Sequence, residues 1–265
     1  MPGTILEKIV ETKRREVAEA MTARPLDTQK EAAGAAEPPR DFYAAATRSG
    51  QINLIAEIKH KSPSGGVLRE PFNPVEIAAI YEQNGAAAAS VLTDRTYFGG
   101  DLSFIDSVHR ATGLPILRKD FIVDSYQIYE SRAAAADAIL LIAEVLKGEQ
   151  LRDYSGLACE LGMTTLIELH DASILEEVLP LVSADRRTVL GINNRDLHAQ
   201  QTDLNICLEM ARNLPAGMGF VAESGIRTRE DVLRLQDAGA CAILVGETLM
   251  RSDDIGAKVR ELIGV

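Results

Sequence analysis

The chain has no tryptophan, and aromatic residues make up only 5% of it. Basic residues are outnumbered as well: 28 Lys and Arg stand against 39 Asp and Glu, for a formal net charge of -11. A nucleic acid or an acidic membrane surface needs a basic footprint on its partner, which this composition could supply only locally. We therefore expect no nucleic-acid and no membrane partner. A few lysines inside a cleft could still bind a small anion.

Cysteine is also scarce. Cys159, Cys207 and Cys241 are widely separated, and each lies in an apolar stretch. An odd number of cysteines at such spacings favours neither a disulfide framework nor a zinc site. The sequence predicts buried thiols in a reducing cytoplasm.

Long apolar runs are missing too. No segment approaches the ~18 to 20 continuous apolar residues that span a bilayer. Residues 4–21 mix basic and acidic side chains, which is unlike the apolar core of a signal peptide. We expect a soluble, cytoplasmic protein.

What the chain does contain is a repeating unit. From Gln51 onward, short runs rich in β-branched and apolar residues alternate with longer amphipathic segments, at roughly the length of one βα unit. Apolar strands with helices between them indicate a parallel sheet buried on both faces. The eight predicted strands are 52–58, 89–93, 115–117, 138–142, 165–169, 189–192, 219–222 and 242–245.

An open, doubly wound sheet could also hold these strands, but no glycine-rich dinucleotide motif follows the first one. Polar or charged residues stand at the C-terminal end of nearly every strand, and only a closed barrel brings all these ends around one mouth. A chain of 265 residues fits one such barrel. We predict a single (β/α)₈ TIM barrel of the α/β class.

An N-terminal helical extension, residues 1–48, is expected before a barrel of residues 49–265, with which it forms one domain. Thr4–Glu7 fits a capping box that opens an amphipathic helix. Residues 24–40 are rich in proline, alanine and polar residues, which favours a linker or a poorly ordered loop. A short helix capped by its first residue is expected over Asp41–Thr47.

Opposite charges two residues apart mark the first predicted strand. Strand periodicity puts Glu57 and Lys59 on the same face, pointing into the barrel. Burying charges is costly unless they are paired, which favours a functional role. A structural ion pair that closes the top of the core is the alternative.

The third strand ends in consecutive charges. Alternation favours Lys119 over Arg118 as the residue that reaches the cavity, unless a twist or bulge exchanges them. A buried lysine has a tunable pKa and suits a general acid or a Schiff base. The alternative is a solvated loop lysine.

The fifth strand carries Glu168 among apolar neighbours. Desolvation would raise the pKa of this carboxyl and nearby lysines would lower it, so it is a candidate general base. His170 follows two residues later. We expect it to cap the next helix or to lie outside the chemistry.

Donor groups follow the sixth strand. Asn193 can orient a substrate or a catalytic carboxylate, and the fork of Arg195 fits a carboxylate or phosphate. The alternatives are a turn asparagine and a salt bridge from Arg195 to Asp196 or Asp203. After strands seven and eight, small residues around Gly225 and Gly246 would let backbone N–H groups approach an anion, unless these are plain turn glycines.

Two glycine-containing stretches, residues 61–66 and 93–100, are predicted to be mobile loops. Pro63, Phe98 and Phe121 could supply an apolar wall for an aromatic ring. A capped barrel core would use the same residues.

In their order and spacing these motifs resemble the indole-3-glycerol phosphate synthase family along nearly the whole chain. The motifs are Glu57-Ile-Lys59, Ser62-Pro63-Ser64-x-Gly66, Lys119-Asp120-Phe121, Leu166-Ile-Glu168, Gly191-Ile-Asn193-x-Arg195-Asp196-Leu197, Glu223-Ser224-Gly225-Ile226 and Val245-Gly246-Glu247.

The resemblance implies a lyase of tryptophan biosynthesis that closes the ring of 1-(2-carboxyphenylamino)-1-deoxyribulose 5-phosphate with loss of carbon dioxide and water. It implies no cofactor and no metal, a small phosphorylated substrate as partner, and a monomer or weak homodimer. Another phosphate-binding barrel enzyme, such as a sugar-phosphate isomerase or a Schiff-base aldolase built on Lys119, is the alternative. A barrel that only binds a ligand is a third reading.

The resemblance also implies roles for individual residues. Lys119 would be the general acid on the ribulose carbonyl, and Glu57, Lys59 and Glu168 would share the other proton transfers. Asn193 and Ser224 would orient substrate and carboxylates. The residues implied in substrate binding are Ser62, Pro63, Phe98, Phe121, Leu140, Arg195, Leu197 and Glu223, with Arg195 at the anthranilate end. The residues implied in phosphate binding are Lys59, Gly225, Gly246 and Glu247.

Overall fold

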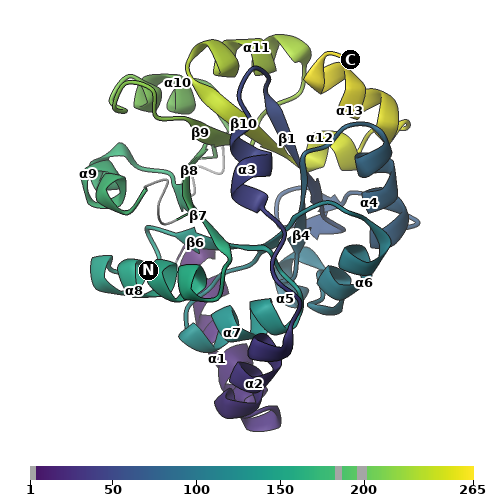
Figure 1. The fold of residues 1–265 in the computed structure, drawn as a ribbon. Helices are drawn as coiled ribbons and strands as arrows, with labels where there is room; N and C mark the ends of the chain where they lie inside the picture. Colours follow the sequence, from purple (N-terminus) through teal and green to yellow (C-terminus); the bar gives the residue numbers. More distant parts are fainter. Residues whose placement is uncertain (1–3, 183–186, 196–201) are drawn as a thin grey trace.

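The computed structural model describes residues 4–182, 187–195 and 202–265. At its centre is a closed barrel of parallel strands in the order β1-β10-β9-β8-β7-β6-β5-β4 (Figure 1). The strands are β1 (Asn53–Ile58), β4 (Ala88–Leu92), β5 (Ile116–Lys119), β6 (Ala138–Ile142), β7 (Thr164–Leu169), β8 (Thr188–Asn193), β9 (Phe220–Glu223) and β10 (Ala240–Val245). The predicted barrel and all its predicted strands are confirmed.

Helices surround the barrel in the ring visible in Figure 1. The longer ones are α4 (Pro74–Gln83), α6 (Ser103–Ala111), α7 (Ser125–Ala133), α8 (Gly148–Glu160), α10 (Asn205–Ala211), α11 (Arg229–Asp237) and α13 (Ile255–Ile263). Shorter helical turns are α5 (Arg95–Phe98), α9 (Leu175–Val178), η1 (Ala172–Ile174), η2 (Leu179–Leu181) and α12 (Glu247–Met250).

Each strand buries both of its faces, because alternate residues point to opposite sides. On β1, Ile55 joins the cluster inside the barrel, whereas Leu54 joins the larger cluster between strands and helices. The strands therefore read as continuous apolar runs in the sequence. Packing in an apolar core does not explain a charged residue within such a run.

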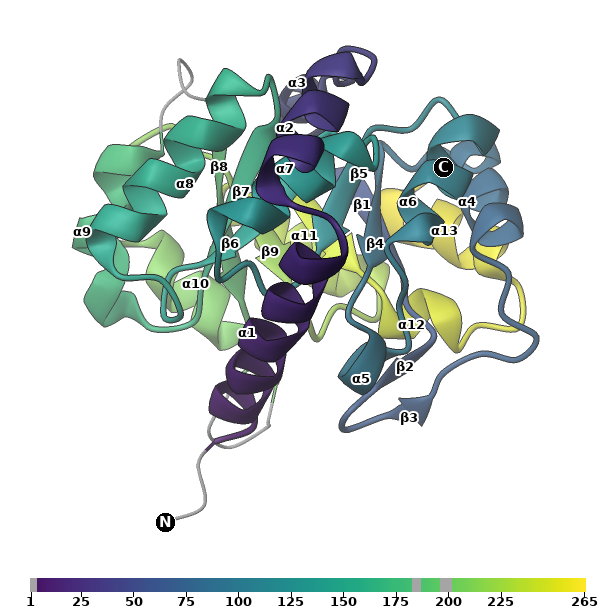
Figure 2. The same cartoon turned by 90° about the horizontal axis from the view of Figure 1, so that it is seen from below.

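The N-terminal extension begins with α1 (Ile5–Ala23), which has the predicted capping box at Thr4. Its last element, α3 (Phe42–Thr47), is capped by Asp41 as predicted and closes one end of the barrel with the fully buried ring of Phe42. Figure 2 shows α3 at that end and α5 at the opposite end, where the strands finish. The bottom of the barrel is thus sealed, and the other end is left to form a site.

The prediction of a linker over residues 24–40 is wrong in its central part. α2 (Leu26–Ala35) is a regular helix that packs against α7, with Gln29 buried and its side-chain amide donating to the hydroxyl of Tyr126 over 3.1 Å. Alanine-rich sequence favours helix once a partner is available, and Pro25 precedes the first turn, where it does no harm.

The two predicted loops also contain regular structure. Within 61–66 and just beyond, β2 (Lys61–Ser62) and β3 (Gly66–Val67) pair as an antiparallel hairpin, and α5 occupies part of 93–100. Gly66, with a φ of +65°, and Gly99, with a φ of +64°, supply the left-handed backbone at these turns.

The three cysteines are free thiols. Cys207 is buried, but Cys159 and Cys241 are only half-buried, so the prediction of buried thiols holds for one of them. Among the described residues, no helix is both long and apolar enough to cross a membrane.

Candidate active site

A cavity of about 560 Å³ lies at the C-terminal ends of the strands. It collects side chains that are far apart in the sequence, which is the arrangement that a closed barrel produces. The predicted site residues that line it are Glu57, Lys59, Ser62, Pro63, Phe98, Lys119, Phe121, Leu140, Glu168, Asn193, Arg195, Glu223, Ser224, Gly225, Gly246 and Glu247. The remaining predicted residue, Leu197, lies outside the described residues.

The end of β5 separates its two cationic residues. Lys119 points into the cavity, whereas Arg118 turns to the helices outside, where it forms ion pairs with Asp120 (3.1 Å) and Glu130 (2.8 Å). Strand alternation is the cause, because Lys119 lies on the same face as Leu117 of the barrel interior. The choice of Lys119 over Arg118 is confirmed.

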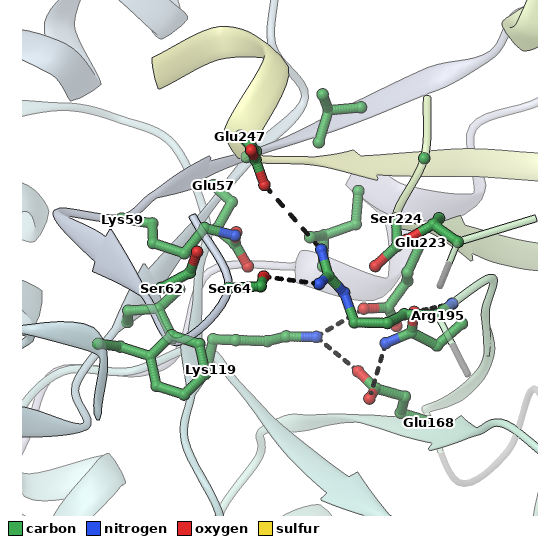
Figure 3. A pocket seen from close by; sticks show the side chains of 18 of the residues that line it. Glu57, Lys59, Ser62, Ser64, Lys119, Glu168, Arg195, Glu223, Ser224 and Glu247 are labelled. Carbon is green, nitrogen blue, oxygen red and sulfur yellow. Dashed lines mark hydrogen bonds and ion pairs between the residues drawn. The ribbon is translucent and has the colours of Figure 1, made fainter. Parts of the chain in front are cut away.

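Lys119 is the centre of the cluster in Figure 3. Its ammonium group donates to Glu168 Oε2 at 2.5 Å and to Glu223 Oε2 at 2.6 Å. The other oxygen of Glu168 accepts a hydrogen bond of 3.1 Å from the side-chain amide of Asn193. Three strands, β5, β7 and β9, thus bring one ammonium and two carboxylates into direct contact.

The ionisation of this cluster follows from burial and charge. Burial alone would lower the pKa of Lys119, but Glu168, Glu223 and Glu57 together raise it above its ordinary value. Burial would raise the pKa of Glu168, but Lys119 and His170 hold it well below the usual range. Burial and the neighbouring Glu168 charge raise the pKa of Glu223 to about 8, although Lys119 opposes the shift. The pKa values of the two carboxyls therefore move in opposite directions: Glu168 is ionised, and Glu223 can hold a proton near neutral pH.

Glu57 and Lys59 of the first strand region pair with each other at the same mouth (Figure 3). Glu57 is 4% exposed, and the Lys59 side chain is 14% exposed. Both face the cavity, as the strand periodicity predicts. Glu57 lies beside the end of β10, the strand that pairs with β1.

Two glycines make room for the carboxylates. A Cβ atom on Gly246 would come within 2.0 Å of Glu57 Oε2, and one on Gly191 would come within 2.6 Å of Glu223 Oε1. Any larger residue would displace the acid that it faces. Both glycines allow a carboxylate to lie close to the backbone. Gly246 therefore does more than form a turn, which was its predicted alternative role.

The backbone after β9 is left-handed at two successive residues. Ser224 has a φ of +66° and Gly225 a φ of +78°. Such a conformation is costly for a residue with a Cβ atom, and here Asn194 supports it by donating to the Ser224 carbonyl at 3.1 Å. Strain retained at a strand end beside a cavity is typical of a functional position.

Arg195 joins three segments of the rim. It donates to Ser64 Oγ at 2.9 Å and lies 4.0 Å from Glu247, as the dashed lines in Figure 3 show. Glu247 also accepts from Arg251 at 2.9 Å. The side chain of Arg195 therefore contacts the hairpin loop and α12 and not Asp203, one of its two predicted alternative partners. The other, Asp196, lies outside the described residues.

One wall of the cavity is apolar. The rings of Phe98 and Phe121 lie with their centroids 6.0 Å apart, and Pro63 and Leu140 line the same space. The first turns of α1 also contribute to the lining, through Ile5, Leu6 and Ile9. The apolar spacing of these residues predicted the helix, but it carried no signal of where the helix packs.

His170 does not cap the next helix, which was one of its two expected places. Its side chain lines the cavity, and its Nε2 lies 3.2 Å from Glu168 Oε1. Asp171, not His170, caps the following turn by accepting from the N–H of Ser173 at 2.8 Å. The position of His170 two residues after Glu168 was the available signal, because both side chains then share a face.

The fold and the site together define a (β/α)₈-barrel enzyme whose mouth combines a lysine-carboxylate cluster, cationic groups for an anion and an apolar wall. The family model for indole-3-glycerol phosphate synthase matches residues 6–262. This chain therefore belongs to the indole-3-glycerol phosphate synthase family, as its motifs predict.

Relatives carrying that name are similar over nearly their whole length. The protein of Albidiferax ferrireducens is 47% identical over 97% of this chain and 97% of its own. That of Chlorobaculum tepidum is 47% identical over 95% of this chain and 97% of its own. That of Rhodopirellula baltica is 45% identical over 98% of this chain and 99% of its own.

Solved structures show a likeness of fold alone. A mutant tryptophan synthase α-subunit from Pyrococcus furiosus superposes with a TM-score of 0.61 at 14% identity, covering 81% of this chain and 99% of that one. Thiamine phosphate pyrophosphorylase from the same organism gives a TM-score of 0.55 at 15% identity, covering 80% of this chain and 93% of that one.

Proposed function

We propose that this chain is a lyase that converts 1-(2-carboxyphenylamino)-1-deoxyribulose 5-phosphate into indole-3-glycerol phosphate, releasing carbon dioxide and water, in the biosynthesis of tryptophan. Family membership supports the reaction. The observation that carries the assignment to this site is the ammonium of Lys119, held between Glu168 and Glu223 in the barrel mouth.

Lys119 is proposed as the general acid. Because its pKa is raised, it carries a proton at physiological pH and can donate it to the ribulose carbonyl oxygen as the aromatic carbon attacks. The raised pKa argues against a Schiff-base aldolase, since an amine must lose its proton before it can attack a carbonyl. A barrel that only binds a ligand would not need the buried cluster of Lys119, Glu168 and Glu223, because ligand binding requires no proton transfer.

The remaining proton transfers are assigned to Glu57, Lys59 and Glu168. After carbon dioxide leaves, loss of water requires that the ring methylene, the former C1 of the ribulose chain, gives up one proton and that the departing hydroxyl receives one. Glu168 is ionised and suits the acceptor role, while Glu57 and Lys59 form a second acid-base couple across the mouth. Asn193 would keep the Glu168 carboxylate in place through its hydrogen bond.

The phosphate end is assigned to Lys59 and to the backbone N–H groups around Gly225, Gly246 and Glu247. The carboxylate of Glu247 would repel a phosphate, but Arg251, at 2.9 Å, offsets its charge and leaves its backbone available. Gly225 follows β9 and Gly246 follows β10, and (β/α)₈ barrels commonly hold a phosphate between the loops after their last two strands.

The aromatic ring of the substrate is assigned to the apolar wall of Pro63, Phe98, Phe121 and Leu140. Arg195 would support the anthranilate carboxylate. Ser62 and Ser224 would bind polar groups of the substrate between the two ends. We propose no cofactor and no metal for this chemistry.

The assay uses the carboxyphenylamino-deoxyribulose phosphate as substrate and follows indole fluorescence. The chain contains no Trp, so its own background is low. The wild type should form product, and Lys119→Ala should lose roughly 10²- to 10⁴-fold in kcat without unfolding, as is usual for the loss of a general acid. Lys59→Ala should raise KM and lower kcat together.

A wild type without turnover would refute the assignment. Trapping of Lys119 by borohydride in the presence of a ketose phosphate would instead favour the aldolase alternative. We also propose a cytoplasmic monomer or weak homodimer, which sedimentation at several concentrations would test.

A further inference from the structure

Three side chains in contact, Glu168, His170 and Glu144, extend from the catalytic cluster toward solvent. Glu168 is 4% exposed, the His170 side chain 8% and the Glu144 side chain 21%. Glu144 lies after β6, whereas Glu168 and His170 lie at the end of β7. Glu144 does not line the catalytic cavity, but His170 does.

The two oxygens of Glu168 have different partners. Lys119 donates to Oε2, whereas Asn193 and His170 both lie against Oε1, at 3.1 Å and 3.2 Å. Glu168 and His170 can meet because residues two apart on a strand share a face. The imidazole thus approaches the carboxylate from the side opposite the proposed general acid.

The other ring nitrogen is held by Glu144. His170 Nδ1 lies 3.3 Å from Glu144 Oε2. Oε1 of the same carboxylate accepts from the backbone N–H groups of His170, at 2.6 Å, and Asp171, at 3.1 Å. The carboxylate of Glu144 is therefore held by the backbone at the end of β7, and the ring of His170 lies between two carboxylates.

The surroundings of the ring favour its cationic form. A second cavity, of about 470 Å³, is bounded by His170 and also by Glu144, Asp171 and Glu209. On that side, Leu6 of α1 and its N-cap Thr4 are uncharged. On the catalytic side, Lys119 and Glu223 flank Glu168. Burial would lower the pKa of His170, but the hydrogen bond with Glu144 and the negative charges of Glu144 and Glu168 raise it to about 10.

We propose that His170 is a positioning residue for Glu168: its imidazolium, fixed by Glu144, keeps the Glu168 carboxylate ionised and turned toward Lys119. The proposal rests on the proposed role of Glu168 as a base. Without the cation, a buried carboxyl beside Glu223 would take up a proton at higher pH and stop acting as a base.

The kinetic test is the pH profile of kcat/KM for His170→Asn, whose amide keeps a donor but cannot ionise. We expect the acidic limb to move at least one pH unit upward and kcat to fall tenfold or more, with KM changed less than threefold. Glu144→Gln should move the limb in the same direction by less. His109→Asn, a half-buried histidine on α6 away from the cavity, is the matched control and should leave the profile unchanged.

A loss of rate in His170→Asn with an unmoved acidic limb would overturn the proposal, because a merely structural role predicts that result. An unchanged rate and profile would overturn it as well. If His170→Asn does not fold, Glu144→Gln carries the same test.

A second measurement does not depend on turnover, so it separates this proposal from the proposed function. The chain has 4 histidines, and ¹⁵N labelling of their rings resolves the titration of each, with His170→Asn giving the assignment. The His170 ring should titrate near pH 10, and both Glu168→Gln and Glu144→Gln should lower the midpoint by one unit or more. A midpoint near the ordinary histidine value, unmoved by either substitution, would overturn the pairing even in an active enzyme.

Discussion

Gly246 lies against Glu57 with no room for a methyl group. The Cβ atom of an alanine would come within 2.0 Å of Glu57 Oε2 and within 2.9 Å of its carboxyl carbon. The end of a flexible side chain can move away, so the fold should survive. The carboxylate that moves is, however, one that we assign to proton transfer.

We predict that Gly246→Ala lowers kcat/KM by about tenfold or more while destabilising the fold by ~1 to 3 kcal/mol, the usual range for overpacking. Steady-state kinetics and urea unfolding would measure both. The control is Gly156→Ala in α8, where a Cβ atom meets nothing within 4 Å. It should leave the kinetics unchanged and stabilise the helix by up to ~1 kcal/mol. Full activity in Gly246→Ala would remove Glu57 from the reaction or show that its exact place does not matter.

Glu223 links the site to the stability of the fold. Its pKa rises from the ordinary glutamate value to about 8 on folding, so the folded protein holds a proton here that the unfolded chain has lost. The stabilisation from this proton is complete below the ordinary pKa and is lost as the pH rises through about 8. The wild type should therefore weaken across this window.

We predict that Glu223→Gln, which stays neutral, lacks this part of the pH dependence. The difference in unfolding free energy between variant and wild type should shift in favour of the variant from pH 5 to pH 9, by on the order of a few kcal/mol. Urea unfolding at several pH values would measure it. Glu160→Gln, an exposed glutamate at the end of α8, is the control and should show a flat difference. A flat difference for Glu223→Gln too would mean that the carboxyl stays ionised beside Lys119.

At the scale of elements, α1 is fastened to the barrel mouth by a buried lysine. Lys13 is 4% exposed and lies 3.1 Å from Asp94 and 3.0 Å from Asp120, with Glu16 at 2.7 Å. Asp94 caps α5, which carries Phe98. Asp120 directly follows Lys119. The ion pairs of α1 thus reach both the apolar wall and the strand end that holds the proposed acid.

We predict that Lys13→Met destabilises the protein by ~3 to 5 kcal/mol, because it removes the buried cation that pairs with Asp94 and leaves Asp120 with Arg118 alone. KM should rise as well, since Ile5, Leu6 and Ile9 of the loosened helix line the cavity. Thermal unfolding and kinetics would measure the two effects. Lys8→Met, at an exposed position on the same helix, should change neither by much. A stable Lys13→Met variant with normal KM would show that α1 is held by its apolar contacts alone.

Elements whose signal is local could be predicted from the sequence, and elements that depend on a distant partner could not. The strands are predictable because a continuous run of β-branched residues is visible in the local sequence. Strand alternation alone likewise indicates that Lys119, and not Arg118, faces the barrel interior. α2 could not be predicted, because a contact with Tyr126 of α7 stabilises a stretch that looks like a linker. The contact of His170 with Glu144 could not be predicted for the same reason, since Glu144 comes from another loop.

For the whole molecule, we propose that the N-terminal extension and the barrel are one domain. The extension touches the barrel at both ends: Phe42 of α3 fills its bottom, and Lys13 of α1 pairs at its mouth. Between them, the guanidinium of Arg132 donates to the Glu37 carbonyl at 2.7 Å, and Arg40 donates to the carbonyls of Leu114 and His109 at 2.8 Å. The described part of the extension could therefore not leave the barrel without exposing groups that are buried between the two.

We predict a single cooperative unfolding transition for the full chain. Scanning calorimetry should give a calorimetric enthalpy equal to the van't Hoff enthalpy, and the loss of helix and the exposure of tyrosine should follow the same curve. Tyr126 is a useful probe, because its hydroxyl donates to the α1 carbonyl of Ala20 and the neighbouring carbonyl of Arg24. Tyr126→Phe keeps the ring and is the control for the signal from this site. Two segments that share a core must unfold together. An early transition in which the tyrosine signal changes while the barrel remains folded would therefore contradict the prediction and show that the extension is a separate unit.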